Sequence, residues 1–429
     1  MNAAPPPLEF KRADWHARVQ LVVFTWFAAA AVTGALRFED WQWFLVHEIL
    51  LGAVTNALFI WSWHFTGAIL RVPDQADRGD ELLRLLALNL GVVGTGLAVR
   101  MQAFPMILGS VGFLLIAVWL HGRALVEAER RALPSPYAFT VRVYVAACAL
   151  LVPGLLLGLW LESLPDGDPM RPRLLLAHIA CNLLGWVGLP ILGTIVTLWP
   201  TMLRVRIASN AARLGRLALP MLLVAVVLTA TAFLVDAPRL AAVGITLYLV
   251  GFAITLQPML AVMRSKAPAS FATWSALAGM VWLFAAVVAM GVRALACTDA
   301  AQLSKGLGWL ALAAITGVLQ VLLGCMSYLL PAMAAGGPAM VRLRNDRADR
   351  AMVVRFMLIN AGAGAVFVFP GPGRAVAAAL LGAGVVLSLL LAGWTLRTPS
   401  SAEIETAEAG RTWIDDREQR PYPFRRSGR

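Results

Sequence analysis

The sequence predicts an all-α fold, a polytopic transmembrane bundle of about twelve helices. Apolar residues make up 59% of the 429 positions, charged residues only 14%, and the mean hydropathy is +0.74. Soluble domains are less apolar and carry more charge. A helix needs roughly 20 apolar residues to cross a bilayer. Runs of this kind are centred near residues 27, 56, 90, 111, 149, 186, 225, 250, 282, 320, 360 and 384.

The ends of the chain differ from its apolar middle. Residues 1–17 are polar and proline-rich, and no small-residue cleavage site follows the first apolar run, so we expect no cleaved signal peptide. Residues 398–429 mix acidic and basic side chains with little periodicity, as solvated tails do. We therefore expect an N-terminal segment (1–17), a transmembrane bundle (18–397) and a C-terminal tail (398–429).

The net charge of +12 is interpreted as a signal of membrane orientation. Loops after the even-numbered spans carry roughly twice as many Lys and Arg residues as the other loops, and positive loops stay in the cytoplasm. Both termini are therefore expected to be cytoplasmic. The lipid bilayer is the expected partner, and nothing in the sequence favours nucleic acid.

Two histidines stand out by their depth in the predicted spans. His47 begins the second span six residues after Trp41, and His178 begins the sixth span five residues after Arg173. Both should lie at similar depth near the outer surface. Polar residues within membranes normally face a cavity and mark a functional site, and neutral imidazole is the commonest metal ligand. We predict that this pair holds a metal or cofactor; the alternative is hydrogen bonding to a neighbouring helix.

The other three histidines are expected to be structural. His64 and His121 fall where the second and fourth spans reach the cytoplasm, and His16 precedes the first span. His47 and His64 are separated by about 26 Å along one helix and cannot share a site.

An internal repeat groups the spans. Residues 193–202 (GTIVTLWPTM) and 324–333 (GCMSYLLPAM) share the pattern G-x6-P-x-M, and alignment of Arg71 with Arg204 brings the histidines of the second and sixth spans within two positions of each other. This spacing predicts three repeats of four helices. The third unit has Trp309 where the second has His178.

These residues carry a resemblance to known families. Twelve helices in three groups of four, with histidines at the outer ends of the second and sixth spans, resemble subunit I of the heme-copper oxidases. The stretch 47–53 (HEILLGA) resembles a segment of NnrS, a heme- and copper-containing membrane protein family of nitrogen-oxide metabolism. Segments 47–71, 178–204 and 322–338 are similar to actinobacterial membrane proteins labelled copper oxidase. The resemblance implies the plasma membrane of a bacterium.

The sequence departs from the reductases of that superfamily. Oxygen- and nitric-oxide-reducing members need further histidines around the seventh and tenth spans, and here the seventh to twelfth spans contain none. Reduction of oxygen or nitric oxide is therefore not expected. His47 and His178 could hold one b-type heme, or copper with a sulfur ligand such as Met326 or Met333. Both methionines lie too deep, which favours heme.

Other polar residues of the equivalent spans are candidates for the pocket wall: Glu48, Asn56, Asn182 and Gln320. Each could instead bond neighbouring helices. Two functional hypotheses remain. One is a heme- or copper-binding protein of electron transfer, nitrogen-oxide response or metal handling, with a redox protein as partner. The other is a transporter of small molecules without a metal, whose site would lie near the midplane at broken helices.

Overall fold

The computed structural model describes residues 12–72, 78–334, 338–398, 400 and 403. Their regular elements are all helical, in this order: α1 (Arg12–Leu36), α2 (Trp41–His47), η1 (Glu48–Val54), α3 (Thr55–Leu70), α4 (Gly79–Arg100), α5 (Phe104–Arg131), α6 (Ala138–Ser163), α7 (Arg171–Ile179), η2 (Ala180–Gly188), α8 (Leu189–Leu203), α9 (Ala211–Leu234), α10 (Pro238–Met263), α11 (Phe271–Ala296), α12 (Ala300–Ser304), α13 (Leu307–Met333), α14 (Pro338–Asp349), α15 (Met352–Val368) and α16 (Pro372–Leu396).

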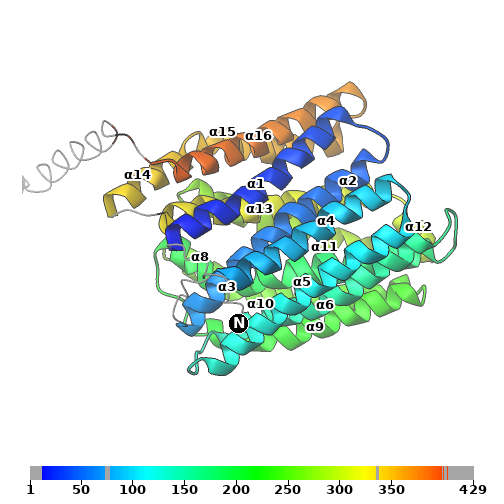
Figure 1. The fold of residues 1–429 in the computed structure, drawn as a ribbon, viewed down its shortest axis with the longest axis horizontal. Coiled ribbons are helices and arrows are strands. Elements are labelled where there is room, and N and C mark those ends of the chain that lie inside the picture. The colour runs from blue at the N-terminus through cyan, green and yellow to red at the C-terminus, as the bar shows by residue number, and fades with distance from the viewer. Residues whose placement is uncertain (1–11, 73–77, 335–337, 399, 401–402, 404–429) are drawn as a thin grey trace, which may run out of the picture.

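The predicted all-α membrane bundle is confirmed. Within the described residues, 11 helices are long and apolar enough to cross a membrane, and the pair α14–α15, bent by 40°, makes up to 12. The bend lies at Ala351, whose φ of 51° interrupts the helix. Figure 1 shows the long helices side by side along one direction, with α1 beginning and α16 ending at the same end of the bundle. We call this end the basic end. The opposite end, near which His47 and His178 lie, is called the histidine end.

The second and sixth spans share two features. Each is a long helix with a π-helical segment in its first half, η1 in one and η2 in the other. Each ends at an arginine in the left-handed conformation, Arg71 or Arg204, both with φ 55°. α13, the tenth span, is α-helical throughout and ends at Ala334 with extended backbone. The structure thus relates two of these spans closely, while the threefold repeat stays a prediction.

Close packing of α11 against α13 depends on glycine. A Cβ atom at Gly279 would lie 2.6 Å from the carbonyl oxygen of Gly317, and one at Gly324 would lie 2.6 Å from that of Ala272. Small residues allow backbones to approach in this way in membranes. This pair of helices therefore forms a tight wall on one side of the bundle.

Two polar triads bond the helices of the bundle. Trp26 Nε1 donates to Asn89 Oδ1 at 2.7 Å, and the amides of Asn89 and Asn56 bond each other. Trp282 Nε1 donates to Asn360 Oδ1 at 2.9 Å, and Asn360 exchanges two bonds with Gln320. Each triad joins three spans, and such bonds contribute about 0.6 kcal/mol on average in membranes.

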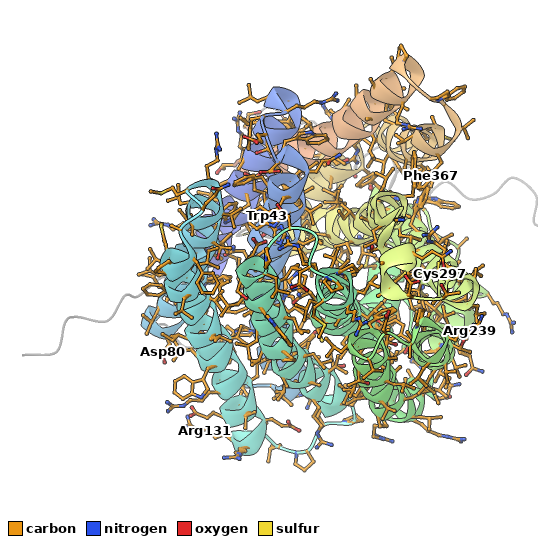
Figure 2. The ribbon with its side chains drawn as sticks, turned by 90° about the vertical axis from the view of Figure 1, so that its right-hand side faces the viewer. Trp43, Asp80, Arg131, Arg239, Cys297 and Phe367 are labelled. Atoms are coloured by element: carbon orange, nitrogen blue, oxygen red, sulfur yellow. The ribbon has the colours of Figure 1, made fainter. Side chains whose placement is uncertain are left out.

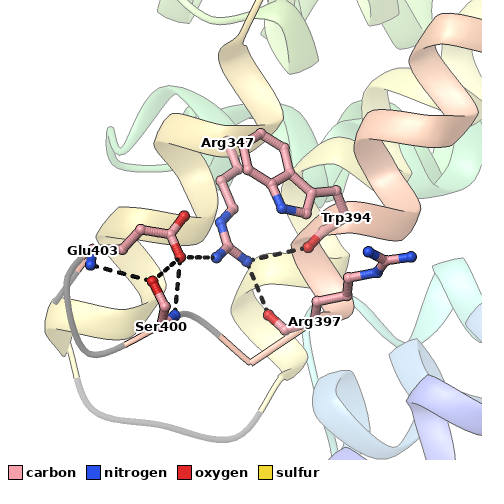
Figure 3. A network of polar contacts seen from close by, with 5 residues as sticks. All are labelled: Arg347, Trp394, Arg397, Ser400 and Glu403. Atoms are coloured by element: carbon pink, nitrogen blue, oxygen red, sulfur yellow. Dashed lines mark hydrogen bonds and ion pairs between the residues drawn. The ribbon is translucent and has the colours of Figure 1, made fainter.

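At the basic end, Arg347 of α14 caps the last turn of α16 (Figure 3). Its guanidinium donates to the carbonyl oxygens of Trp394 and Arg397 at 3.2 and 2.9 Å, and to the Glu403 carboxylate at 2.8 Å. The final carbonyls of a helix lack partners within it, so a cation there stabilises the end. Bonds from Ser400 and Arg347 lower the pKa of Glu403 to about 2.

Candidate functional site

A cavity of about 830 Å³ lies inside the bundle and reaches the α6–α7 loop at the histidine end. Its wall is mostly leucine, isoleucine, valine and alanine. The charged, polar and tryptophan side chains along it are few: Trp43, His47, Thr55, Thr95, Glu162, Asp168, Arg171, His178, Asn182, Trp186, Thr229, Tyr248 and Ser304. A mostly apolar cavity with a few convergent polar groups is typical of a ligand or cofactor site.

Figure 2 looks along the helices onto the histidine end. The labelled Trp43 lies in this view between α4 and α5 on one side and the helices around Arg239 and Cys297 on the other. The lining residues come from both sides, with Thr95 and Val111 from α4 and α5, and Ala286 and Ala311 from α11 and α13. The cavity therefore runs across the bundle, passing the two histidines.

Both histidines lie where a regular helix turns into a π-helix. His47 is the last residue of α2, directly before η1, and His178 lies two residues before η2. Single π-helical turns recur at functional sites because they change the direction of side chains at that point. Pro190, the second residue of α8, has no N–H to donate just after η2, which contributes to the change of hydrogen bonding there.

The two imidazole rings lie next to each other although His178 follows His47 by 131 positions in the chain. Their centroids are 6.4 Å apart and the ring planes are inclined by 38°. Trp43 stacks on His47 with centroids 4.0 Å apart. The structure thus brings together the pair that the sequence singled out, on the wall of one cavity.

Each ring uses Nδ1 to bond a backbone carbonyl. His47 Nδ1 is 2.8 Å from Trp43 O, and His178 Nδ1 is 2.9 Å from Gly154 O. A carbonyl oxygen only accepts, so in the neutral rings the proton lies on Nδ1 and the lone pair on Nε2. Asn182 Nδ2 lies 3.1 Å from His178 Nδ1, but it has a better acceptor in His178 O at 2.9 Å.

This protonation is the one that metal ligation through Nε2 requires. Histidine ligands commonly donate their other N–H to a backbone carbonyl, which orients the ring and makes the coordinating nitrogen more basic. Here two such nitrogens, Nε2 of His47 and Nε2 of His178, belong to adjacent rings on a cavity wall. The arrangement can hold a metal between two imidazoles.

Among the four candidates for the pocket wall, only Asn182 lines this cavity. Asn56 and Gln320 belong to the two polar triads, where neighbouring spans satisfy their amides. Glu48 lies about 100° around the helix from His47 and is directed toward Thr33 of α1. Its Oε2 is buried and finds no hydrogen-bond partner among the described residues.

The structure adds residues that the sequence did not point to. Glu162 and Trp43 line the cavity near the histidines and lie close to each other. A Cβ atom at Gly158 would lie 2.9 Å from His178 Cε1, so glycine makes room for this ring. The spacing Gly154-x3-Gly158 was an available signal, since it typically marks a close helix contact.

Sulfur ligands are scarce at the site. Met290 lines the cavity, but Met326 and Met333, the two candidates for copper, do not. Within the described part of the chain, no group of three or more His, Cys, Asp or Glu side chains is placed to hold a metal ion. A site with four protein ligands is therefore not formed by these residue types here, and the two imidazoles stand as a pair.

The remaining histidines gather at the basic end, deeper in the protein than expected. His16 lies inside α1 rather than before it, with 6% of its surface exposed, and stacks on Trp61. His121 is 1% exposed, because α5 continues ten residues beyond it; it stacks on Phe59 and bonds Ser62 at 2.8 Å. His64 packs edge-on against His16 at 5.0 Å.

Comparison with known proteins assigns the chain to no family. No protein-family model matches the chain, and no curated protein matches it. The resemblance to the heme-copper oxidases and NnrS thus stays a prediction, and the site itself must carry any functional argument.

Proposed function

We propose that this chain is an integral membrane protein that binds one b-type heme between His47 and His178. The observation that carries the proposal is the adjacent pair of imidazoles, each with Nδ1 bonded to a carbonyl, on the wall of an apolar cavity. Heme iron accepts one or two axial ligands, most often histidine.

The dimensions of the site agree with this ligation. A metal about 2 Å from each coordinating nitrogen, with each nitrogen about 1 Å from its ring centre, places the two ring centres about 6 Å apart. The observed separation is 6.4 Å. The cavity volume of about 830 Å³ lies within the range of roughly 300–1,000 Å³ typical of cofactor pockets, and it extends to both sides of the pair.

Two protein ligands on one heme suit electron transfer. Such a heme supplies one-electron chemistry and leaves no coordination position open for oxygen. His47 and His178 would hold the iron, while Gly154 O and Trp43 O keep the rings oriented. A redox protein would approach the histidine end, where Trp43 and Glu162 line the cavity. Nitrogen-oxide response and metal handling are the alternative roles that the same two histidines would serve.

Orientation completes the proposal. The excess of basic loop residues favours cytoplasmic termini, which places the histidine end on the outer side of a bacterial plasma membrane. The reductase activities of the superfamily are not proposed, because among the described residues His47 and His178 are the only histidines that line the cavity.

Copper and transport are the competing functions. Two imidazoles with Met290 nearby would suit a copper ion. The π-helical segments η1 and η2, where two spans change their hydrogen bonding beside an apolar cavity, also favour a small-molecule transporter, whose site would lie at irregular points of its helices. Each alternative predicts a different result in the experiment below.

The test is an absorption spectrum of the full-length protein, expressed with both a heme precursor and copper supplied, and purified in detergent. We expect a Soret band and sharp reduced-state bands of a six-coordinate low-spin heme, at about one heme per chain. Copper at one equivalent without a Soret band would support the copper site. Absence of both metals would refute metal binding and favour the transporter.

A further inference from the structure

Trp43 makes two contacts with His47, one through its backbone and one through its side chain. Trp43 O lies 2.8 Å from His47 Nδ1, and the indole stacks on the imidazole with ring centroids 4.0 Å apart and planes inclined by 21°. The two residues are four positions apart in α2, and side chains at this spacing are neighbours on one face of a helix. One residue therefore contacts both Nδ1 and the face of this ring.

The two contacts restrain different motions of the imidazole. A hydrogen bond fixes the position of Nδ1, but it tolerates a tilt of the ring because the angle at the hydrogen varies over a broad range. A stacked aromatic ring restrains the tilt, since turning the imidazole would separate the two faces or make them collide. The indole thus decides the plane of His47, while the carbonyl decides which nitrogen is left for a metal.

The indole of Trp43 is itself packed by other residues. The ring of Phe44 lies edge-on to it with centroids 5.1 Å apart, and Phe38 lies edge-on to Phe44 at 5.3 Å. Glu162 of α6 lies close to Trp43 on the cavity wall. Trp43 therefore has a defined position against which His47 is oriented.

His178 is oriented by another helix. Its Nδ1 lies 2.9 Å from Gly154 O, and its Cε1 packs against Gly158, where a Cβ atom would lie 2.9 Å away; both glycines belong to α6. The angle of 38° between the two imidazole planes thus depends on Trp43 for one ring and on α6 for the other. The surroundings of the axial ligands tune a heme, and the angle between two axial imidazoles affects how the d orbitals of the iron split.

We infer that Trp43 is a positioning residue, which sets the plane of the His47 imidazole and with it the angle between the two axial ligands of the heme. The inference rests on the proposed function and adds to it a residue that ligates no metal. Replacing the indole should change the electronic structure of the iron and leave the number of hemes bound unchanged.

The test compares Trp43→Leu, which keeps an apolar side chain without a flat ring, with Trp43→Phe, which keeps a flat ring. Trp41→Leu is the matched control, because Trp41 belongs to the same helix and does not line the cavity. Heme content and electron paramagnetic resonance of the oxidised heme are measured on the full-length proteins in detergent. We expect the heme content of the wild type in all three variants. At least half of the low-spin signal should move to other g values in Trp43→Leu, whereas Trp43→Phe and Trp41→Leu should keep the wild-type signal.

The outcomes decide the role of the indole. An unchanged signal in Trp43→Leu at full heme content would overturn the inference, and so would equal changes in Trp43→Leu and Trp41→Leu. Loss of heme from Trp43→Leu but not from Trp43→Phe would support the need for a flat ring, and loss from both would overturn it. Should Trp43→Leu fail to fold, Trp43→Met provides the same comparison.

A second measurement does not need heme. In NMR spectra of heme-free protein with labelled histidine, the His47 ring protons, assigned with His47→Ala, should show a ring-current shift that Trp43→Leu removes and Trp43→Phe retains in part. A shift that persists in Trp43→Leu would contradict the stacking. A wild type that shows the shift but binds no heme would refute the proposed function, and with it the role of Trp43 toward the heme. A wild type that binds heme without the shift would refute the inference alone.

Discussion

The histidines at the two ends of the bundle have different surroundings. At the histidine end, His47 and His178 each bond a backbone carbonyl through Nδ1 and line a cavity. At the basic end, His16 and His121 are buried against aromatic rings, and His121 Nε2 bonds Ser62. Neither His16 nor His64 lines the large cavity.

The difference shows that burial alone does not identify a functional histidine. His121 is more deeply buried than either member of the pair, yet Phe59 and Ser62 occupy its face and its Nε2. A ligand histidine needs an oriented ring, a free nitrogen and open space beside it. Only the histidine end combines all three among the described residues.

The largest expected effect is on cofactor content. His47→Ala or His178→Ala should reduce the Soret absorbance per chain more than tenfold, because one remaining axial ligand holds the iron weakly. His64→Ala should leave it within about 20%, since His64 is about 26 Å from His47 along the helix. Equal losses from both ends would contradict the comparison.

The next effect comes from crowding the pair without removing it. Gly158→Ala would place a methyl group 2.9 Å from His178 Cε1 and displace that ring. We expect a large loss of bound heme together with a destabilisation of about 1–3 kcal/mol, as overpacking costs. The matched control is Gly112→Ala in α5, where a Cβ meets nothing within 4 Å. Thermal unfolding measures the loss of stability, and the absorption spectrum measures the heme content. A heme content equal to that of the control would contradict the prediction that the methyl group displaces the His178 ring.

At the basic end, replacing a buried histidine should lower the stability of the protein without lowering its heme content. His121→Ala removes a stacked ring and leaves Ser62 without this partner, which should cost about 1–3 kcal/mol. Ser62→Ala should cost about 1 kcal/mol, the value of one hydrogen bond. Both should keep the Soret band per folded chain. Loss of heme from stably folded His121→Ala would place a functional histidine at this end too.

The smallest effect is a pH dependence of the Arg347–Glu403 contact. The pKa of Glu403 in the folded protein is about 2, below its ordinary value of 4.5. The contact is therefore fully stabilising above about pH 4.5 and is lost as the pH falls toward 2. Proteolysis after residue 397 should increase over this range in the wild type and be insensitive to pH in Glu403→Gln. We expect no matching pH-dependent change in proteolysis at the histidine end.

Much of the fold follows from composition and spacing. The twelve apolar runs of the sequence correspond to the eleven helices and the bent pair, because chain length across a bilayer and apolar content are properties of each segment alone. The break in the eleventh span at Ala351 was not predicted, since it depends on backbone conformation at one residue. The tenth span also differs from the second and sixth, because it has no π-helical segment. The spacing of residues in the sequence did not predict this difference.

For the site, the sequence by itself predicted that His47 and His178 lie at similar depth on two related spans. Only the tertiary structure decided that their rings are 6.4 Å apart, that Gly154 O orients one of them, and that Asn56 and Gln320 are used to bond helices. Depth is fixed by the 1.5 Å rise per residue and the position of the apolar run. The direction of a side chain depends on local helix winding, here η1 and η2, and on which neighbour offers a partner or leaves a space.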